Sequence, residues 1–141
     1  MADRSRISSG SPFERTIGFS RALRVGDRVL VSGTAPVFAE GEPCPDDAGL
    51  QARRCFAIIE DALDAAGASL RDIVRTRMYL TNAEDAEAVG AVHGELLDDA
   101  RPAATMVVVA GLLDPAWKVE VEAEAVVPDA GGADADSRSG R

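Results

Sequence analysis

The amino-acid sequence predicts an α+β domain in which a single mixed sheet carries two helices on one face. Apolar residues recur at helical spacing in two segments, 52–66 and 86–97. Strand-like segments stand before, between and after them, in the order strand, strand, helix, strand, helix, strand, strand. The last of these, 119–125, alternates Val or Ala with Glu, as a strand with one buried face does. Because two helices cover only one face of such a sheet, the other face is left without a cover.

The composition is typical of one globular domain, with 141 residues, 46% hydrophobic and 28% charged. A net charge of −9 with no basic run argues against a nucleic-acid partner, because phosphate contacts need a basic surface. Cys44 and Cys55 have no metal-binding spacing and His93 is the one histidine, so we expect no metal site and no disulfide framework. No apolar run approaches the length of a membrane span, so we expect a cytoplasmic protein without a membrane partner.

The N-terminal part of the sequence predicts an arm followed by a hairpin. Residues 1–15 mix Ser, Arg, Gly and Pro and are expected to form a flexible arm. Residues 16–23 fit a strand, 25–28 a turn, and 29–31 the return strand, which ends at Ser32-Gly33. A long loop with several prolines follows, and loops of that length are often functional.

The first helix is expected to start after Asp46 or Asp47 and to stop at Gly67, a residue suited to the position after a helix end. Its apolar stripe includes Cys55, which is therefore expected to be inert core. The next strand, 73–80, places three polar or aromatic side chains on one face, namely Arg75, Arg77 and Tyr79.

The second helix is expected to be capped by Thr81 or Asn82 and to stop at Arg101-Pro102. His93 falls on its apolar stripe, which favours a structural histidine over a catalytic one. The run 105–110 is apolar on both faces of any strand, so something must cover both faces. We therefore expect a symmetric oligomer with clefts between its subunits. Residues 128–141 have nothing to bury and are expected to be a disordered tail, which leaves 16–127 as the domain.

Six short segments carry a resemblance to a known family. They are Val31-Ser32-Gly33-Thr34-Ala35-Pro36, Gln51-Ala52-Arg53, Ala66-Gly67, Ile73-Val74-Arg75-Thr76-Arg77-Met78-Tyr79-Leu80, Arg101-Pro102-Ala103 and Val119-Glu120-Val121-Glu122-Ala123. In this order and spacing they resemble the RidA/YjgF family, also called endoribonuclease L-PSP-like, over residues 16–127. The resemblance implies a chorismate-mutase-like fold and a homotrimer with ligand clefts between subunits. It also implies hydrolysis of reactive enamines and imines to 2-oxo acids and ammonia without a cofactor.

The family's functional positions can be transferred one by one to this sequence. Glu120 stands at the position of the carboxylate that orients water, which makes it the candidate catalytic residue. Ala104 stands where deaminases of the family have the arginine that pairs with the substrate carboxylate. Phe19 aligns with a tyrosine and Gly90 with an asparagine. The candidate ligand-binding residues are Phe19, Arg21, Ser32, Gly33, Arg77, Gly90, Ala104, Thr105, Met106 and Trp117.

The missing arginine has an energetic consequence that can be estimated. A charge-assisted hydrogen bond contributes roughly 1.5–3 kcal/mol, and a guanidinium–carboxylate pair makes two of them. Affinity for a small 2-imino acid should then fall by about two orders of magnitude or more without a substitute. Arg21, expected on the strand face of Phe19, and Arg77, expected on a central strand, are the two candidates. For each arginine an ion pair with a structural role is the alternative.

Two functional hypotheses follow from these residues. The first is an enzyme that hydrolyses or otherwise processes an imine, an enamine or a related labile metabolite, with Glu120 placing the water. The second is a trimer that binds a small molecule without turnover, with a specialised biosynthetic step as a further alternative. Glu122 and Glu124 are expected to be surface or ion-pair residues. For Trp117 a packing role is favoured, with a position beside the cleft as the alternative. Endoribonuclease activity fits poorly with the charge of −9.

Overall fold

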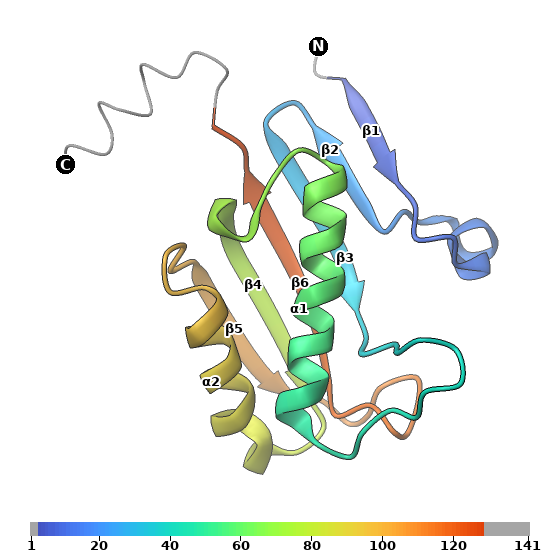
Figure 1. Cartoon of the computed structure of the whole chain (residues 1–141), viewed down its shortest axis with the longest axis vertical. Helices are drawn as coiled ribbons and strands as arrows, with labels where there is room; N and C mark the ends of the chain where they lie inside the picture. Colours follow the sequence, from blue (N-terminus) through green and yellow to red (C-terminus); the bar gives the residue numbers. More distant parts are fainter. Residues whose placement is uncertain (1–2, 129–141) are drawn as a thin grey trace.

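A computed structural model describes residues 3–128, in which one six-stranded sheet carries two α-helices on the same face (Figure 1). The strands are β1 (Arg4–Ile7), β2 (Ala22–Val25), β3 (Arg28–Thr34), β4 (Ile73–Leu80), β5 (Ala103–Val108) and β6 (Val119–Val126). The helices are α1 (Ala48–Ala65) and α2 (Ala86–Leu96). The strand order is β1-β2-β3-β6-β4-β5, and every neighbouring pair is antiparallel except the parallel pair β4–β5. The predicted α+β architecture is confirmed.

The N-terminal segment differs from its prediction. Arg4–Ile7, expected within a flexible arm, forms β1 and pairs with β2. The side chains of β1 are mostly exposed, so backbone hydrogen bonds to β2 hold the strand in place. The polar composition of the segment does not indicate such pairing. Residues Glu14–Gly18, which span the end of the predicted arm and the start of the predicted first strand, form a π-helical turn (η1). The turn ends at Gly18, whose φ of 90° breaks an extended run. Strand β2 therefore begins only at Ala22.

The helix ends follow the sequence signals. Asp47 caps α1 by accepting a hydrogen bond from the Leu50 backbone N–H at 2.9 Å. The chain leaves α1 through Gly67, at a φ of 82°. Asn82 caps the short 3₁₀ turn η3 (Ala83–Asp85) that leads into α2, rather than capping α2 itself. Arg24 on β2 donates to the Ala66 carbonyl at 2.7 Å and so joins the hairpin to the end of α1.

The core lies between the helices and the alternate residues of β3, β6 and β4. Val119, Val121, Ala123 and Ala125 are all at most 3% exposed, which confirms the buried face predicted for β6. Cys55 is fully buried as predicted, and burial raises the pKa of its thiol to about 12. His93 shares a hydrogen bond of 2.8 Å with the Thr76 hydroxyl, a structural role.

Strand β5 is an edge of the sheet and pairs only with β4. Val107 is 42% exposed and Val108 is 54% exposed, although these neighbours point to opposite faces of the strand. The single chain therefore leaves apolar surface uncovered on both faces of β5, where the sequence demands burial. The opposite side of the sheet from the helices is here called the open face, and no helix of residues 3–128 covers it (Figure 1). Residues 129–141, which include most of the predicted tail, lie outside the described part of the chain.

Candidate functional site

Glu120 lies on the open face of β6, with its carboxylate above Gly33 on the neighbouring strand β3. A β-carbon added at Gly33 would overlap with Glu120 Oε2, so only glycine leaves room for this carboxylate. The approach is possible because β3 carries an irregularity between Val31 and Thr34, where the register with β6 shifts. Burial raises the pKa of Glu120, and its neighbour Glu122 adds to this effect, whereas Arg21 opposes it.

Arg21 lies in the segment just before β2, and its side chain also reaches Gly33. Its Nη2 donates to the Gly33 carbonyl at 2.6 Å. Its Nε is buried without a partner among the described residues. Burial lowers the pKa of the Arg21 guanidinium, while the charges of Glu14 and Glu120 raise it. Arg21 and Glu120 are thus electrostatic neighbours that form no direct ion pair among the described residues.

The segment that carries Phe19 and Arg21 is held by β3. The Ser32 backbone N–H donates to the Arg21 carbonyl at 3.0 Å, and the Ser32 hydroxyl donates to the Ser20 carbonyl at 2.7 Å. Phe19 has an extended backbone and is 36% exposed. The prediction that Phe19 and Arg21 share a strand face is wrong, because both precede the strand after the π-helical turn. The structure nevertheless brings Arg21, Ser32, Gly33 and Glu120 together.

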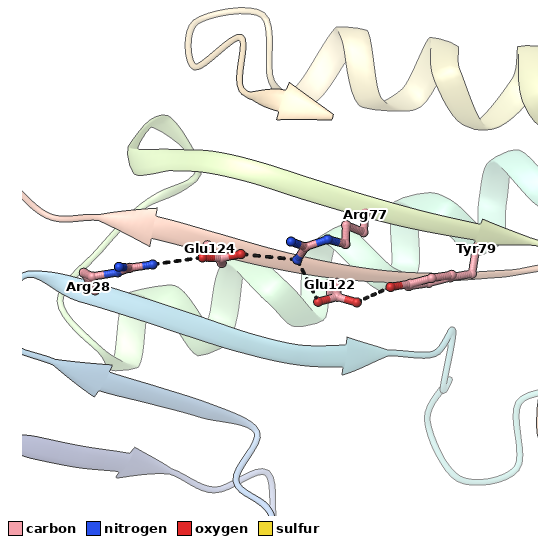
Figure 2. A network of polar contacts seen from close by, with 5 residues as sticks. All are labelled: Arg28, Arg77, Tyr79, Glu122 and Glu124. Carbon is pink, nitrogen blue, oxygen red and sulfur yellow. Dashed lines mark hydrogen bonds and ion pairs between the residues drawn. The ribbon is translucent and has the colours of Figure 1, made fainter. Parts of the chain in front are cut away.

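The remaining two glutamates of β6 belong to a network of polar contacts across the open face (Figure 2). Arg77 Nη1 lies 3.2 Å from both Glu122 and Glu124, and Arg28 Nη2 lies 3.1 Å from Glu124. The Tyr79 hydroxyl donates to Glu122, and this hydrogen bond raises the pKa of Tyr79. The ion-pair roles predicted for Glu122 and Glu124 are confirmed. Glu120 alone of the three has no ion-pair partner among the described residues.

Arg77 does not replace the missing arginine within one chain. Its register partner on β5 is Thr105, whereas Ala104 is the partner of Thr76, whose side chain is buried under α2. Alternation therefore places Arg77 and Ala104 on opposite faces of the sheet. Arg77 also forms ion pairs with Glu122 and Glu124, which agrees with the structural role that was the alternative to ligand binding.

A second group of candidate residues lies at the other edge of the sheet. Gly90 on α2 faces Met106 on β5, because a β-carbon at Gly90 would lie 4.0 Å from Met106 Cε. Ala104 shares the face of Met106, and Thr105 lies between them on the open face. Strands β6 and β4 separate this group from Gly33 on β3. One chain therefore brings the predicted site residues into two groups and does not join them.

The loop before β6 is fixed by a residue whose role the sequence did not reveal. Gln51 on α1 is fully buried, and its Nε2 donates to the carbonyls of Pro45 at 2.8 Å and Ala116 at 3.0 Å. Its Oε1 accepts from the Lys118 backbone N–H at 2.7 Å. Trp117 lies inside this clamped loop and is partly buried, and its backbone N–H donates to the Asp114 carbonyl at 3.0 Å. The feature of the sequence that indicates this role is the position of Gln51, a polar residue, on the apolar stripe of its helix.

No group of three His, Cys, Asp or Glu side chains within residues 3–128 is arranged to hold a metal ion. In the same range, no helix has the length and apolar character needed to cross a membrane. The groups that meet at the site are a desolvated carboxylate, a neighbouring guanidinium and the polar backbone of β3.

Comparison with known proteins places these features in a family. The family model described as Endoribonuclease L-PSP matches residues 11–127. The uncharacterized protein SCO2049 of Streptomyces coelicolor is 38% identical over 125 residues, which cover 85% of this chain and 90% of that protein. The mitochondrial protein mmf1 of Schizosaccharomyces pombe is 30% identical over 121 residues, 86% of this chain and 70% of that protein.

Solved structures give the same result. The crystal structure of Rv2704 from Mycobacterium tuberculosis, a member of the YjgF/YER057c/UK114 family, superposes with a TM-score of 0.81. The two sequences are 42% identical, and the match covers 89% of this chain and all of that chain (100%). The single mixed sheet with its helices on one face is the chorismate-mutase-like fold of these neighbours. The chain belongs to the endoribonuclease L-PSP family, that is, to the YjgF/RidA proteins.

Proposed function

We propose that this protein is a RidA-like enzyme that hydrolyses the C=N bond of a small reactive imine, or of the enamine from which it forms. The observation that carries the proposal is the contrast among three carboxylates on one strand face. Glu122 and Glu124 are ion-paired, whereas Glu120 has no ion-pair partner within residues 3–128. Glu120 is half-buried, lies over Gly33, and has a pKa that burial raises. A carboxylate in that state is suited to accept a proton from water.

The chemistry needs few groups. Glu120 would take a proton from water as the water oxygen attacks the imine carbon, and would pass this proton to the imine nitrogen. In the resulting carbinolamine the hydroxyl proton moves to the nitrogen through Glu120 as the C=O bond forms, so that the C–N bond breaks and ammonia and a carbonyl product leave. The positive charge of Arg21 close to Glu120 would favour the ionised form of Glu120, which is the form that acts as base. No cofactor is required for any of these steps.

We further propose that the site is completed by a second copy of the chain in a homotrimer. The two groups of candidate residues lie on opposite sides of the sheet's centre, at β3 with β6 and at β5 with α2. The exposed apolar residues of β5 supply a reason for association. Contact of one copy's β5 with the next copy's β3 would bring Ala104 and Met106 toward Glu120.

Assembly can be tested by the mass of the protein in solution, measured by light scattering. Val108→Asp should convert the trimer into smaller species. Val37→Asp is the matched control, because Val37 in the loop after β3 is also 54% exposed. A wild-type monomer over the whole concentration range would contradict the trimer.

Activity can be tested by adding the purified protein to an amino-acid oxidase reaction that releases imines, trapped with semicarbazide. The protein should speed loss of the imine, and Glu120→Gln should remove the acceleration. Glu60→Gln, at an exposed position of α1, removes the same charge as a control. Absence of acceleration over several amino acids would rule out the proposed reaction.

The second candidate is a trimer that binds a small molecule without turnover. It is favoured by the replacement of the family's arginine by Ala104, since that exposed residue offers no charge to a substrate carboxylate. In that case a ligand should raise the melting temperature in proportion to ln(1 + [L]/Kd) while no product forms. A specialised biosynthetic step remains a variant of the first candidate, distinguished by which imine is consumed.

A further inference from the structure

A hollow with a volume of about 700 Å³ lies against β1, β2 and β3 on the open face. Pockets that bind small molecules have volumes of about 300–1,000 Å³. Leu23 and Leu30, which are cross-strand partners, give the hollow an apolar floor. Phe19 and Ser32 also line it, so it adjoins the group formed by Arg21, Gly33 and Glu120.

Three arginines line this hollow, namely Arg4, Arg6 and Arg15. Arg4 and Arg6 are two residues apart on β1 and therefore point to the same side of the sheet. Arg6 is the register partner of Leu23, and Arg15 comes from the turn η1. None of the three forms an ion pair with another residue of the range 3–128. This is a local concentration of positive charge on a chain with a net charge of −9.

The two acidic residues of the hollow are engaged elsewhere. Glu122 pairs with Arg77 at 3.2 Å and accepts from Tyr79. Glu14 accepts hydrogen bonds from the Ser9 backbone N–H at 2.9 Å and from the Ser9 hydroxyl at 2.5 Å. The bonds to Ser9 also fasten η1 to the segment before it, which keeps Arg15 beside the hollow. Both carboxylates keep their charge, so the hollow has three guanidinium groups against two carboxylates. The arginines are held in no ion pair among the described residues and can therefore turn to a ligand.

We infer that this hollow binds the anionic group of a small molecule with an apolar body, in the first instance a carboxylate. The apolar body of the ligand would pack on Leu23 and Leu30, and the arginines would bind its carboxylate. The inference rests on the proposed function for the place of the ligand, because Ser32 lines the hollow and the next residue, Gly33, lies under Glu120. It assigns the contact with the carboxylate to the arginines on the β1 side, in place of the family's arginine at Ala104.

The binding test uses the whole protein and a matched pair of probes. 3-Phenylpropanoate carries the charge and the apolar body, and 3-phenylpropanamide keeps the body without the charge. Titration calorimetry should show binding of the acid at least fivefold tighter than binding of the amide. Phenyl phosphate distinguishes a general anion site from a carboxylate site. Equal affinities for acid and amide would overturn the inference.

Two variants locate the site. The double substitution Arg6→Gln with Arg15→Gln should weaken binding of the acid roughly tenfold and leave the amide unchanged. Arg71→Gln is the control, since it removes an exposed arginine that does not line the hollow. Unchanged binding of the acid by the double variant would mean that the arginines only solubilise the sheet edge, and the inference fails.

The inference and the proposed reaction fail in different ways. Selective binding of the acid without any imine hydrolysis would leave the binding site standing and reject the reaction. Imine hydrolysis that depends on Glu120 but not on Arg6 and Arg15 would keep the reaction and reject the binding site. If the double variant changes the mass in solution and not the affinity, the hollow is a contact between copies, which also overturns the inference.

Discussion

The carboxylate of Glu120 occupies the space that a side chain at Gly33 would need. This relationship depends on the register shift in β3 and on the absence of an ion pair at Glu120 among the described residues. Because the blocking atom is the end of a flexible side chain, a methyl group at position 33 would move the carboxylate rather than the backbone.

Gly33→Ala should therefore separate stability from activity. We expect the free energy of unfolding to change by less than about 1 kcal/mol, because only one flexible side chain must shift. A misplaced base should lower imine hydrolysis by about 100-fold. Urea unfolding and the semicarbazide assay measure the two effects. A variant with full activity would show that Glu120 does not need its place above Gly33.

Glu120→Gln should make the protein more stable at neutral pH. Burial raises the pKa of Glu120 in the folded state, so the folded protein favours the protonated form. The stability linked to this group is complete below its unfolded pKa and is lost as pH rises through the folded pKa. Glutamine should thus stabilise at pH 7, by less than about 1 kcal/mol for a carboxylate that solvent partly screens, and have little effect at pH 3. Thermal unfolding of both proteins from pH 3 to pH 7 measures this difference in stability. Destabilisation by Glu120→Gln at pH 7 would contradict the raised pKa of Glu120.

Ala104→Arg should restore affinity for a small 2-imino acid in the semicarbazide assay. Two charge-assisted hydrogen bonds would lower KM by about 100-fold, provided the partner copy's site is adjacent. Ala103→Arg is the control, because Ala103 is the exposed neighbour on the opposite face of β5. An equal gain from both substitutions would indicate a general charge effect instead of a placed contact.

Gln51→Met should be strongly destabilising although the two side chains have similar shapes. The change removes three hydrogen bonds and leaves the Pro45 and Ala116 carbonyls and the Lys118 N–H without their partner. The expected loss is about 2–4 kcal/mol in the free energy of unfolding. Leu50→Met, at an exposed position beside it, should cost less than about 0.5 kcal/mol. A similar small cost for Gln51→Met would show that water replaces the amide.

Arg77→Met should lower the free energy of unfolding by about 1 kcal/mol, since it leaves Glu122 and Glu124 without their shared cation. The loss should shrink in high salt, because the side chains are partly exposed. A double-mutant cycle with Glu124→Gln isolates the pair. A coupling energy near zero would mean that the network contributes no stability.

Much of the fold could be predicted because its signals are local. Asp47, Gly67 and the alternation of β6 each act through residues within a few positions in the chain. The strand β1 could not be predicted, because its side chains are exposed and its stability comes from pairing with β2. The turn η1 was also missed, because the apolar spacing around Ile17 and Phe19 fits a strand equally well.

The sequence by itself determined that Glu120, Glu122 and Glu124 share one face, since side chains alternate along any strand. Only the tertiary structure decided that they differ. Cross-strand register gives Glu122 and Glu124 the cations of β4 and β3, and it leaves Glu120 above the bare backbone of Gly33. Register depends on residues far apart in the chain, so the spacing within one strand cannot encode which carboxylate is left unpaired.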